Sequence, residues 1–203
     1  FAETGIPASI VSKYLAEHGV VVEKTGLYSF FIMFTIGITK GRWNSMVTEL
    51  QQFKDDYDKN QPLWKVLPDF VAKNPIYERI GLKDLCHLIH GVYALNDVAR
   101  LTTEMYLSNM EPAMKPTDAF AKMAHREIDR VPIDELEGRI TSILLTPYPP
   151  GIPLLIPGEC FNATIVRYLK FARDFNSAFP GFETDIHGLV KREDGEYYVD
   201  CVR

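Results

Sequence analysis

Several features that mark common protein classes are missing from the sequence. Only three cysteines occur among 203 residues, namely Cys86, Cys160 and Cys201, and no CxxC pair is present. Their number and spacing support neither a zinc site nor a disulfide framework, and they fit a reducing cytoplasm. The longest apolar run, residues 28 to 38, is too short to span a membrane, so we expect no membrane partner. Residues 1 to 4 carry no basic charge, and we expect no signal peptide.

The sequence also has fewer basic than acidic residues, and it lacks the standard catalytic motifs. The formal net charge is −5, from 22 lysines and arginines against 27 aspartates and glutamates. A nucleic-acid-binding domain normally carries a basic surplus, so we expect no nucleic-acid partner. The sequence contains no GxGxxG, GxxxxGK[ST], GxSxG or HExxH pattern. It therefore gives little support to a nucleotide-binding fold, a hydrolase nucleophile or a zinc protease.

The composition that remains, 46% apolar and 24% charged residues, is that of an ordinary globular protein. Apolar spacing and the positions of glycine and proline predict an α+β fold. A boundary near residues 58 to 75 predicts two domains, 1–62 and 63–203. We expect helices over residues 7–18, 40–57, 82–95 and 97–107, a short one within 62–74, and others beginning at 116 and 162. We expect strands over residues 20–22, 28–36, 126–133, 139–145, 188–190 and 197–202, the last two joined by a turn at 193–195.

The most distinctive stretch is residues 146 to 159, which contain five of the thirteen prolines. Each proline fixes φ near −65° and removes a backbone donor, so neither an α-helix nor a central strand can run through the segment. The segment is nevertheless apolar, with side chains such as Tyr148, Ile152 and Leu154. Two interpretations stay open, a stiff brace across a core and the wall of a binding site.

Glu23 is the first candidate for a ligand-binding side chain. It ends an apolar run and precedes a turn, which is where binding groups often lie in units of mixed helices and strands. A solvated turn explains the same pattern. If the position is a site, a partly desolvated carboxylate there favours a cationic partner. Nothing near Lys24 in the sequence marks it as an activated amine nucleophile.

Two histidine patterns are weaker candidates. His87 and His90 are spaced to share a helix face, but a metal site needs three or four ligands and no further ligand is clearly placed. Packed or solvent-facing histidines explain this pair better. Asp185 and His187 bring a carboxylate near an imidazole, an arrangement that is common in loops.

Five segments taken together carry more information than any single motif. They are Gly5-Ile6-Pro7, Val21-Val22-Glu23-Lys24-Thr25-Gly26, Tyr148-Pro149-Pro150-Gly151-Ile152-Pro153, Pro157-Gly158-Glu159 and Phe179-Pro180-Gly181-Phe182-Glu183. In this order and spacing they resemble the C-terminal part of the bacterial lysine, arginine and ornithine decarboxylases. These are pyridoxal-phosphate enzymes of the aspartate-aminotransferase fold type. The resemblance covers essentially the whole sequence.

The resemblance implies that the sequence contains parts of two domains of a longer protein. Residues 1–62 would end the small subdomain beside the cofactor domain, and residues 63–203 would form the family's separate α+β C-terminal domain. In this family the lysine that holds pyridoxal phosphate follows a Ser-x-His pattern, and no His-Lys pair occurs in this sequence. The absence of an initiator methionine also suggests a fragment. We therefore expect the chain alone neither to bind the cofactor nor to decarboxylate an amino acid.

The same resemblance implies which residues approach the substrate. Glu23 would face the side-chain ammonium of a basic amino acid, with Thr25 nearby. Tyr148, Gly151 and Glu159 would belong to a loop at the entrance of the site, close to a subunit interface, since these enzymes assemble at least as homodimers.

The substrate itself is harder to choose from the sequence. Glu-Lys-Thr-Gly resembles the lysine and ornithine members, whereas residues 38 to 43 and Val202 resemble the arginine members. A compact ammonium needs one well-placed carboxylate, whereas a guanidinium favours a bidentate planar partner. We expect lysine first, because Glu23 is the residue closest to the chemistry, arginine second and ornithine third. Two other classes stay open, a non-catalytic assembly or regulatory module and an independent small-molecule-binding domain.

Overall fold

The computed structural model describes residues 4 to 148, 151 to 193 and 195 to 203, and it forms two compact units. Unit 1 comprises the described residues up to Asn96 together with Pro180–Phe182, and unit 2 comprises Asp97–Phe179 and Glu183–Arg203. The units therefore divide after Asn96 rather than near residues 58 to 75, because the helices that follow Pro62 pack within unit 1.

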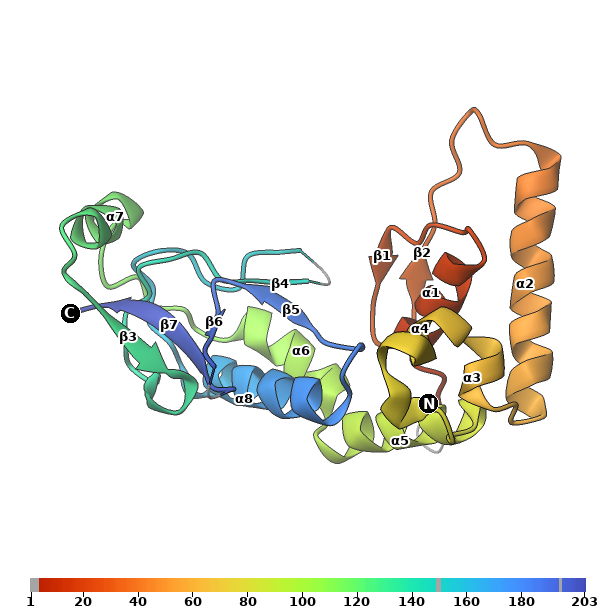
Figure 1. Cartoon of the computed structure of the whole chain (residues 1–203). Coiled ribbons are helices and arrows are strands. Elements are labelled where there is room, and N and C mark those ends of the chain that lie inside the picture. Colours follow the sequence, from red (N-terminus) through yellow and green to blue (C-terminus); the bar gives the residue numbers. More distant parts are fainter. Residues whose placement is uncertain (1–3, 149–150, 194) are drawn as a thin grey trace. The chain divides into compact units, whose positions relative to one another are not determined.

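Unit 1 consists of helices and one short β-hairpin (Figure 1). In the hairpin, Lys24 pairs with Phe31 and Thr25 pairs with Phe30. The 19-residue helix α2 packs against α1 and α5. The elements are α1 (Ala8–Glu17), β1 (Lys24–Thr25), β2 (Phe30–Phe31), α2 (Lys40–Asp58), α3 (Leu63–Val66), α4 (Pro68–Lys73), η1 (Pro75–Tyr77) and α5 (Leu82–Leu95).

Local sequence explains where the first helix begins and ends. Pro7 precedes α1, and Gly19 adopts a left-handed φ of 74° just after it, as expected of a helix stop. The buried face of α1 carries Ile10, Tyr14 and Leu15, which are at most 1% exposed. Burial of this face, rather than its capping, fixes the helix in unit 1.

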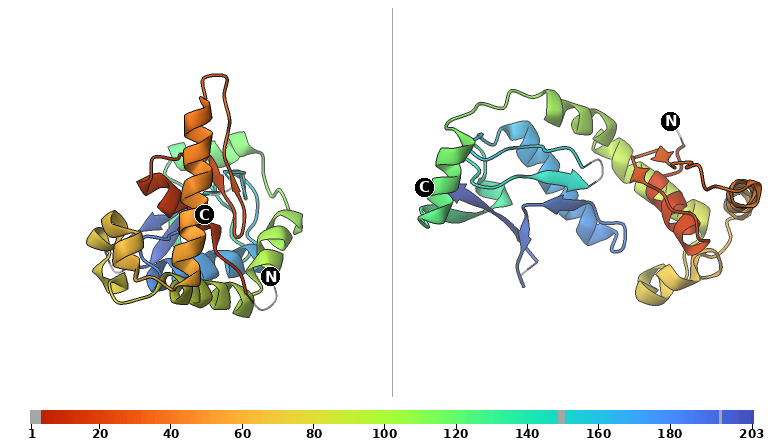
Figure 2. Two further views of the ribbon diagram at one scale, coloured as in Figure 1. Left: turned by 90° about the vertical axis from the view of Figure 1, so that its right-hand side faces the viewer. Right: turned by 90° about the horizontal axis from the view of Figure 1, so that it is seen from above.

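Among its described residues, unit 2 combines the α-helices α6, α7 and α8 and a 3-10 turn, η2, with two small antiparallel sheets. Helix α8 packs against α6, and a three-stranded sheet of order β3-β7-β6 shares a core with both (Figures 1 and 2). A separate ribbon pairs β4 with β5. The elements are α6 (Val98–Leu107), α7 (Pro116–Ala124), β3 (Ile128–Pro132), η2 (Ile133–Glu135), β4 (Thr146–Tyr148), α8 (Ala163–Ala178), β5 (Asp185–His187), β6 (Val190–Lys191) and β7 (Tyr197–Val202).

Asn162 caps α8 and ties it to the segment after α6. Its side-chain oxygen accepts a hydrogen bond from the Ile165 amide at 2.9 Å. Its side-chain amide donates to the Ser108 hydroxyl at 2.9 Å and to the Asn109 carbonyl oxygen at 3.0 Å. One side chain therefore satisfies an orphan donor at the helix start and joins two parts of unit 2.

The α+β class and the longer helices are confirmed, whereas several predicted strands are wrong. Residues 20–22 form no strand, and Val21 is 74% exposed. The strand predicted over residues 28–36 shortens to Phe30–Phe31, because β1 offers only two residues as a partner. Residues 139–145 make isolated bridges to three different segments, so no continuous ladder forms there.

Sequence reasoning also missed the ribbon of β4 and β5. Pro147 lies inside β4, opposite Ile186. Both strands of a two-stranded ribbon are edge strands, so one of them tolerates a missing backbone donor. Pro149 and Pro150 of the proline-rich segment and Asp194 of the predicted 193–195 turn lie outside the described residues. Within the described ranges, no helix is both long and apolar enough to cross a membrane.

Replacing Asn162 with alanine should destabilise unit 2 by about 1–2 kcal/mol, since the cap and two further hydrogen bonds are lost. Urea unfolding followed by far-UV circular dichroism measures the change. Both tryptophans, Trp43 and Trp64, belong to unit 1, so their emission follows that unit separately. Asn44→Ala is the control, because the Asn44 side chain makes no hydrogen bond with described residues. Equal unfolding midpoints for the two variants would contradict the assignment.

Candidate functional site

A hollow of about 440 Å³ in unit 1 contains Glu23, and we call it the Glu23 hollow. Its walls come from the chain after α1, the chain after β2 and the first turns of α2. The lining residues are His18, Gly19, Val20, Val21, Glu23, Ile32, Met33, Phe34, Ile38, Arg42, Trp43, Ser45 and Met46. Most of these side chains are apolar, and several of them are exposed.

The backbone of the hairpin fixes the position of Glu23. Its amide donates to the Phe31 carbonyl oxygen at 2.9 Å, and the Gly26 amide donates to the Ser29 carbonyl oxygen at 2.7 Å to close the turn. The Glu23 carboxylate is exposed and has no side-chain partner among the described residues. An unpaired carboxylate between apolar walls is suited to bind a cation with an apolar stem.

Thr25 lies in the same hairpin but does not line the Glu23 hollow. Its hydroxyl lies 2.9 Å from the Ser12 hydroxyl, on α1. The half-buried Thr25 side chain therefore anchors the hairpin to α1. Glu23 therefore lines the hollow, whereas Thr25 does not.

Two ionisable residues of the hollow, Arg42 and His18, were not predicted from the sequence. Arg42 lines it, and its guanidinium has no partner among the described residues. His18 Nδ1 donates a hydrogen bond to the Tyr14 carbonyl oxygen at 2.7 Å, and its Nε2 lies 3.6 Å from Glu49 Oε2. Tyr14 donates its hydroxyl to the same Glu49 oxygen, and burial followed by this bond raises the pKa of Tyr14. The four-residue spacing of Tyr14 and His18 was the available signal.

The proline-rich segment lies in unit 2, where its residues brace one another. The Tyr148 ring packs on His187, with 4.6 Å between ring centroids. Gly151 has a φ of 78°, and a Cβ atom there would lie 2.9 Å from the Tyr148 ring. Glu159 accepts a hydrogen bond from the Ile156 amide at 2.8 Å, so its carboxylate closes its own turn. Tyr148 is 47% exposed, whereas Gly151 and Glu159 are partly buried.

Three other histidines, His90, His87 and His187, each lie near a different polar side chain. His90 is buried, and its Nδ1 lies 2.6 Å from the Tyr28 hydroxyl. His87 Nε2 is 3.5 Å from the Tyr57 hydroxyl. No group of three potential metal ligands comes together in the described part of the chain. His187 and Asp185 do meet, at 3.0 Å between Nε2 and Oδ2, on an exposed face.

The described cysteines are free thiols. Burial raises the pKa of Cys86 to about 12 and, as the main cause, that of Cys201 to about 12. Burial therefore disfavours the nucleophilic thiolate form of both side chains.

Comparison with known proteins gives the same family over both units. The family model described as "Orn/Lys/Arg decarboxylase, C-terminal domain" matches residues 99–203, and the model described as "Orn/Lys/Arg decarboxylase, major domain" matches residues 1–42. The lysine decarboxylase LdcA of Pseudomonas aeruginosa is 49% identical over the whole chain, which spans 28% of that protein's length. A solved structure of lysine decarboxylase A from the same organism superposes on 99% of the chain with a TM-score of 0.93, covering 28% of that structure.

Relatives that act on other amino acids are less similar. The biodegradative arginine decarboxylase of Escherichia coli is 35% identical over 99% of the chain and 27% of its own length. The constitutive ornithine decarboxylase of Escherichia coli is 31% identical over 97% of the chain and 28% of its own length. The resemblance seen in the sequence is thereby confirmed.

Replacing Gly151 with alanine tests how the proline-rich segment holds Tyr148. The new methyl group meets the Tyr148 ring, so the variant should lose about 1–2 kcal/mol of unfolding free energy and shift the Tyr148 ring resonances. Gly138→Ala is the matched control, with a φ of 77° and nothing within 4 Å of its Cβ position. Tyr148 resonances that move equally in both variants would contradict the brace.

Proposed function

Because the chain belongs to the Orn/Lys/Arg decarboxylase family, we propose that it forms the C-terminal part of a lysine decarboxylase that converts lysine to cadaverine and CO₂. The observation that carries the proposal is its higher identity to a lysine decarboxylase than to the arginine and ornithine enzymes. Arginine and then ornithine are the alternative substrates of the same reaction.

Glu23 is the proposed partner of the substrate's side-chain ammonium. Its carboxylate is free, and apolar side chains such as Val21 and Phe34 beside it suit the methylene chain of lysine. A single carboxylate matches a compact ammonium better than a planar guanidinium, which favours a bidentate partner. Thr25 then acts through its bond to Ser12, which holds the hairpin that carries Glu23.

Pyridoxal phosphate is the proposed cofactor of the complete enzyme, where it supplies the electron sink for decarboxylation. The residues of this chain do not fit the role of its covalent partner. No lysine lines the Glu23 hollow, and the exposed Lys24 beside it lies outside the lining. The cofactor lysine therefore belongs to the rest of the complete protein, and we assign no step through the cofactor to this chain.

The proline-rich segment is the proposed wall of the approach to the site in a cytoplasmic homo-oligomer, at least a dimer. Exposure of Tyr148 and the bracing by Gly151 and Glu159 support this role. A wall that is already fixed loses little conformational entropy when a substrate passes or binds.

An assembly module is the second candidate. The observation that favours it is the exposed apolar surface of unit 1, which includes Val21, Phe34 and Trp43. Exposed apolar patches often mark association surfaces. An assembly module would leave cadaverine production by the complete protein at zero, which separates the two candidates.

Glu23→Gln in the complete enzyme should raise the KM for lysine by about 10- to 100-fold with little change in kcat, since a charged hydrogen bond to the bound ammonium is lost. Steady-state CO₂ release measures both constants. Glu78→Gln is the control, because the exposed Glu78 carboxylate has no partner among described residues. A KM unchanged from the parent enzyme would remove Glu23 from the substrate site.

The purified chain mixed with pyridoxal phosphate should show neither the visible absorbance of lysine-bound cofactor at stoichiometric occupancy nor CO₂ release from labelled lysine. The complete enzyme should show both, because it contains the cofactor lysine. Stoichiometric cofactor that survives dialysis of the chain alone would contradict this assignment.

A further inference from the structure

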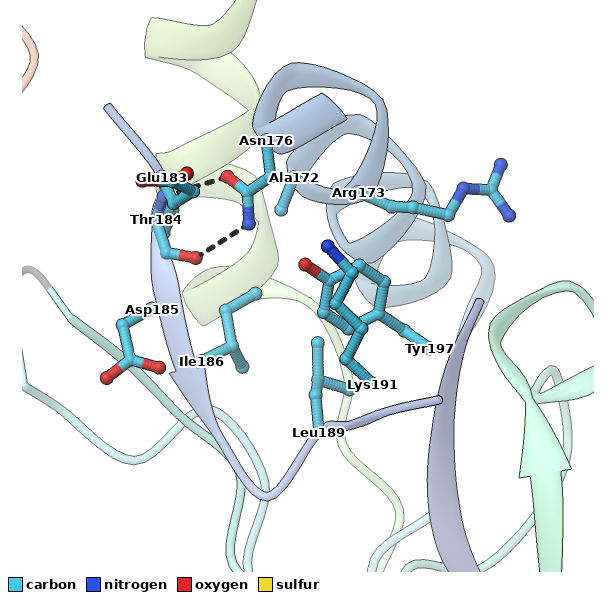
Figure 3. Close-up of a pocket in the computed structure, with 10 residues that line it drawn as sticks. All are labelled: Ala172, Arg173, Asn176, Glu183, Thr184, Asp185, Ile186, Leu189, Lys191 and Tyr197. Atoms are coloured by element: carbon cyan, nitrogen blue, oxygen red, sulfur yellow. Dashed lines mark hydrogen bonds between the residues drawn. The ribbon is translucent and has the colours of Figure 1, made fainter. Parts of the chain in front are cut away.

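A second cavity, of about 380 Å³, lies within unit 2 (Figure 3). It opens between the C-terminal half of α8 and the strands β5, β6 and β7. Its floor is apolar and is formed by Ala172, Ile186 and Leu189, of which the first two are at most 5% exposed. The volume is within the range of small-molecule sites.

A double hydrogen bond holds two walls of this cavity together. The Thr184 amide donates to the Asn176 side-chain oxygen at 2.8 Å, and the Asn176 side-chain amide donates to the Thr184 carbonyl oxygen at 3.0 Å (Figure 3). The clamp joins α8 to the segment that leads into β5. The cavity therefore exists before any ligand binds, which lowers the entropy cost of binding.

Three of the four charged side chains around the cavity are engaged elsewhere. Arg173 forms ion pairs with Asp134 at 2.8 Å and with Asp174 at 2.9 Å, and its guanidinium points out of the cavity in Figure 3. Asp185 bonds to His187 and points away from the centre. Glu183 at the rim also has an interaction of its own.

Lys191 and Tyr197 supply the polar groups at the centre of the cavity. The Lys191 ammonium lies 5.5 Å from the Tyr197 ring centroid, and it and the Tyr197 hydroxyl point toward the Asn176 amide (Figure 3). In the part of the chain that the structure describes, neither group has a hydrogen-bond or ion-pair partner. One free cation and one free hydroxyl thus stand over an apolar floor.

We propose that this cavity is a binding site for small organic carboxylates with a short branched or unbranched apolar tail. The carboxylate accepts hydrogen bonds from the Lys191 ammonium and the Tyr197 hydroxyl, and the tail lies on Ile186 and Leu189. A carboxylate is favoured over an amine because the charged group that points into the centre of the cavity, the Lys191 ammonium, is positive and has no hydrogen-bond or ion-pair partner among the described residues. The site lies in unit 2 and does not depend on the proposed decarboxylase function or on the Glu23 hollow.

Three ligands with the same branched carbon skeleton test whether the cavity prefers a negative, a positive or a neutral head group. The chain, labelled with ¹³C in its isoleucine and leucine methyl groups, is titrated with 3-methylbutanoate, 3-methylbutylamine or 3-methylbutan-1-ol. We expect saturable shifts of the Ile186 and Leu189 methyl signals with the carboxylate, and affinities at least about tenfold lower for the amine and the alcohol. The absence of a saturable shift, or equal binding of the amine, overturns the proposal.

Two variants and a matched control assign the binding to this site. Lys191→Gln should weaken 3-methylbutanoate binding by about tenfold, and Tyr197→Phe should weaken it by about threefold while it keeps the ring. Arg192→Gln removes the neighbouring cation, which lies 4.4 Å from the Tyr198 ring centroid and outside the cavity, and should change the affinity less than about twofold. Unchanged affinity in Lys191→Gln and Tyr197→Phe, or an equal loss in Arg192→Gln, contradicts the site. The methyl spectrum of each variant without ligand reports whether it is folded.

Discussion

Burial of one apolar face on each main helix is the constraint on which both units depend. In α8 the buried side chains include Ile165, Leu169 and Phe175, each at most 3% exposed. Full burial of such a side chain contributes about 1.5–3 kcal/mol. The ion pairs of Lys170 and Arg173 on the other face of α8 are partly exposed and contribute at most about 1 kcal/mol each. The apolar face therefore positions α8, and with it the α8 wall of the cavity in unit 2 that we propose as a carboxylate site.

This constraint explains why helices were predicted well and strands were not. A helix such as α5 has its apolar period, its start at Gly81 and its end near Asn96 within one stretch of sequence. A strand needs a partner that sequence does not reveal. The apolar residues 20–22 pair with no strand among the described residues, and Val21 is 74% exposed, whereas β4 forms in spite of Pro147 because β5 is available. Residues 63–96 pack within unit 1 through distant contacts such as that of Tyr77 with Pro180, and local sequence does not reveal such contacts.

The candidate site likewise combines residues that have a local sequence signal with residues that have none. The hypothesis for Glu23 came from its place before a turn, and the family resemblance came from short segments that periodicity does not explain. The side chains that support the site join residues far apart in sequence, as in the bonds between Ser12 and Thr25 or Tyr14 and Glu49. Such pairs leave no local pattern. The two interpretations of the proline-rich segment are compatible, because Tyr148 packs on His187 and still has 47% of its surface exposed.

The surroundings of Glu23 explain why its proposed role needs the complete protein. A carboxylate attracts an ammonium strongly only where water is excluded, because exposed ion pairs contribute little. Around Glu23 the apolar walls are present, yet Val21 and Phe34 remain 74% and 55% exposed. Water therefore reaches the carboxylate from the open side of the hollow. We expect another part of the complete enzyme to cover these apolar side chains. The same contact would exclude water from the Glu23 carboxylate. An ion pair between this carboxylate and the ammonium of a lysine substrate would then be stronger than an exposed pair, and therefore more selective.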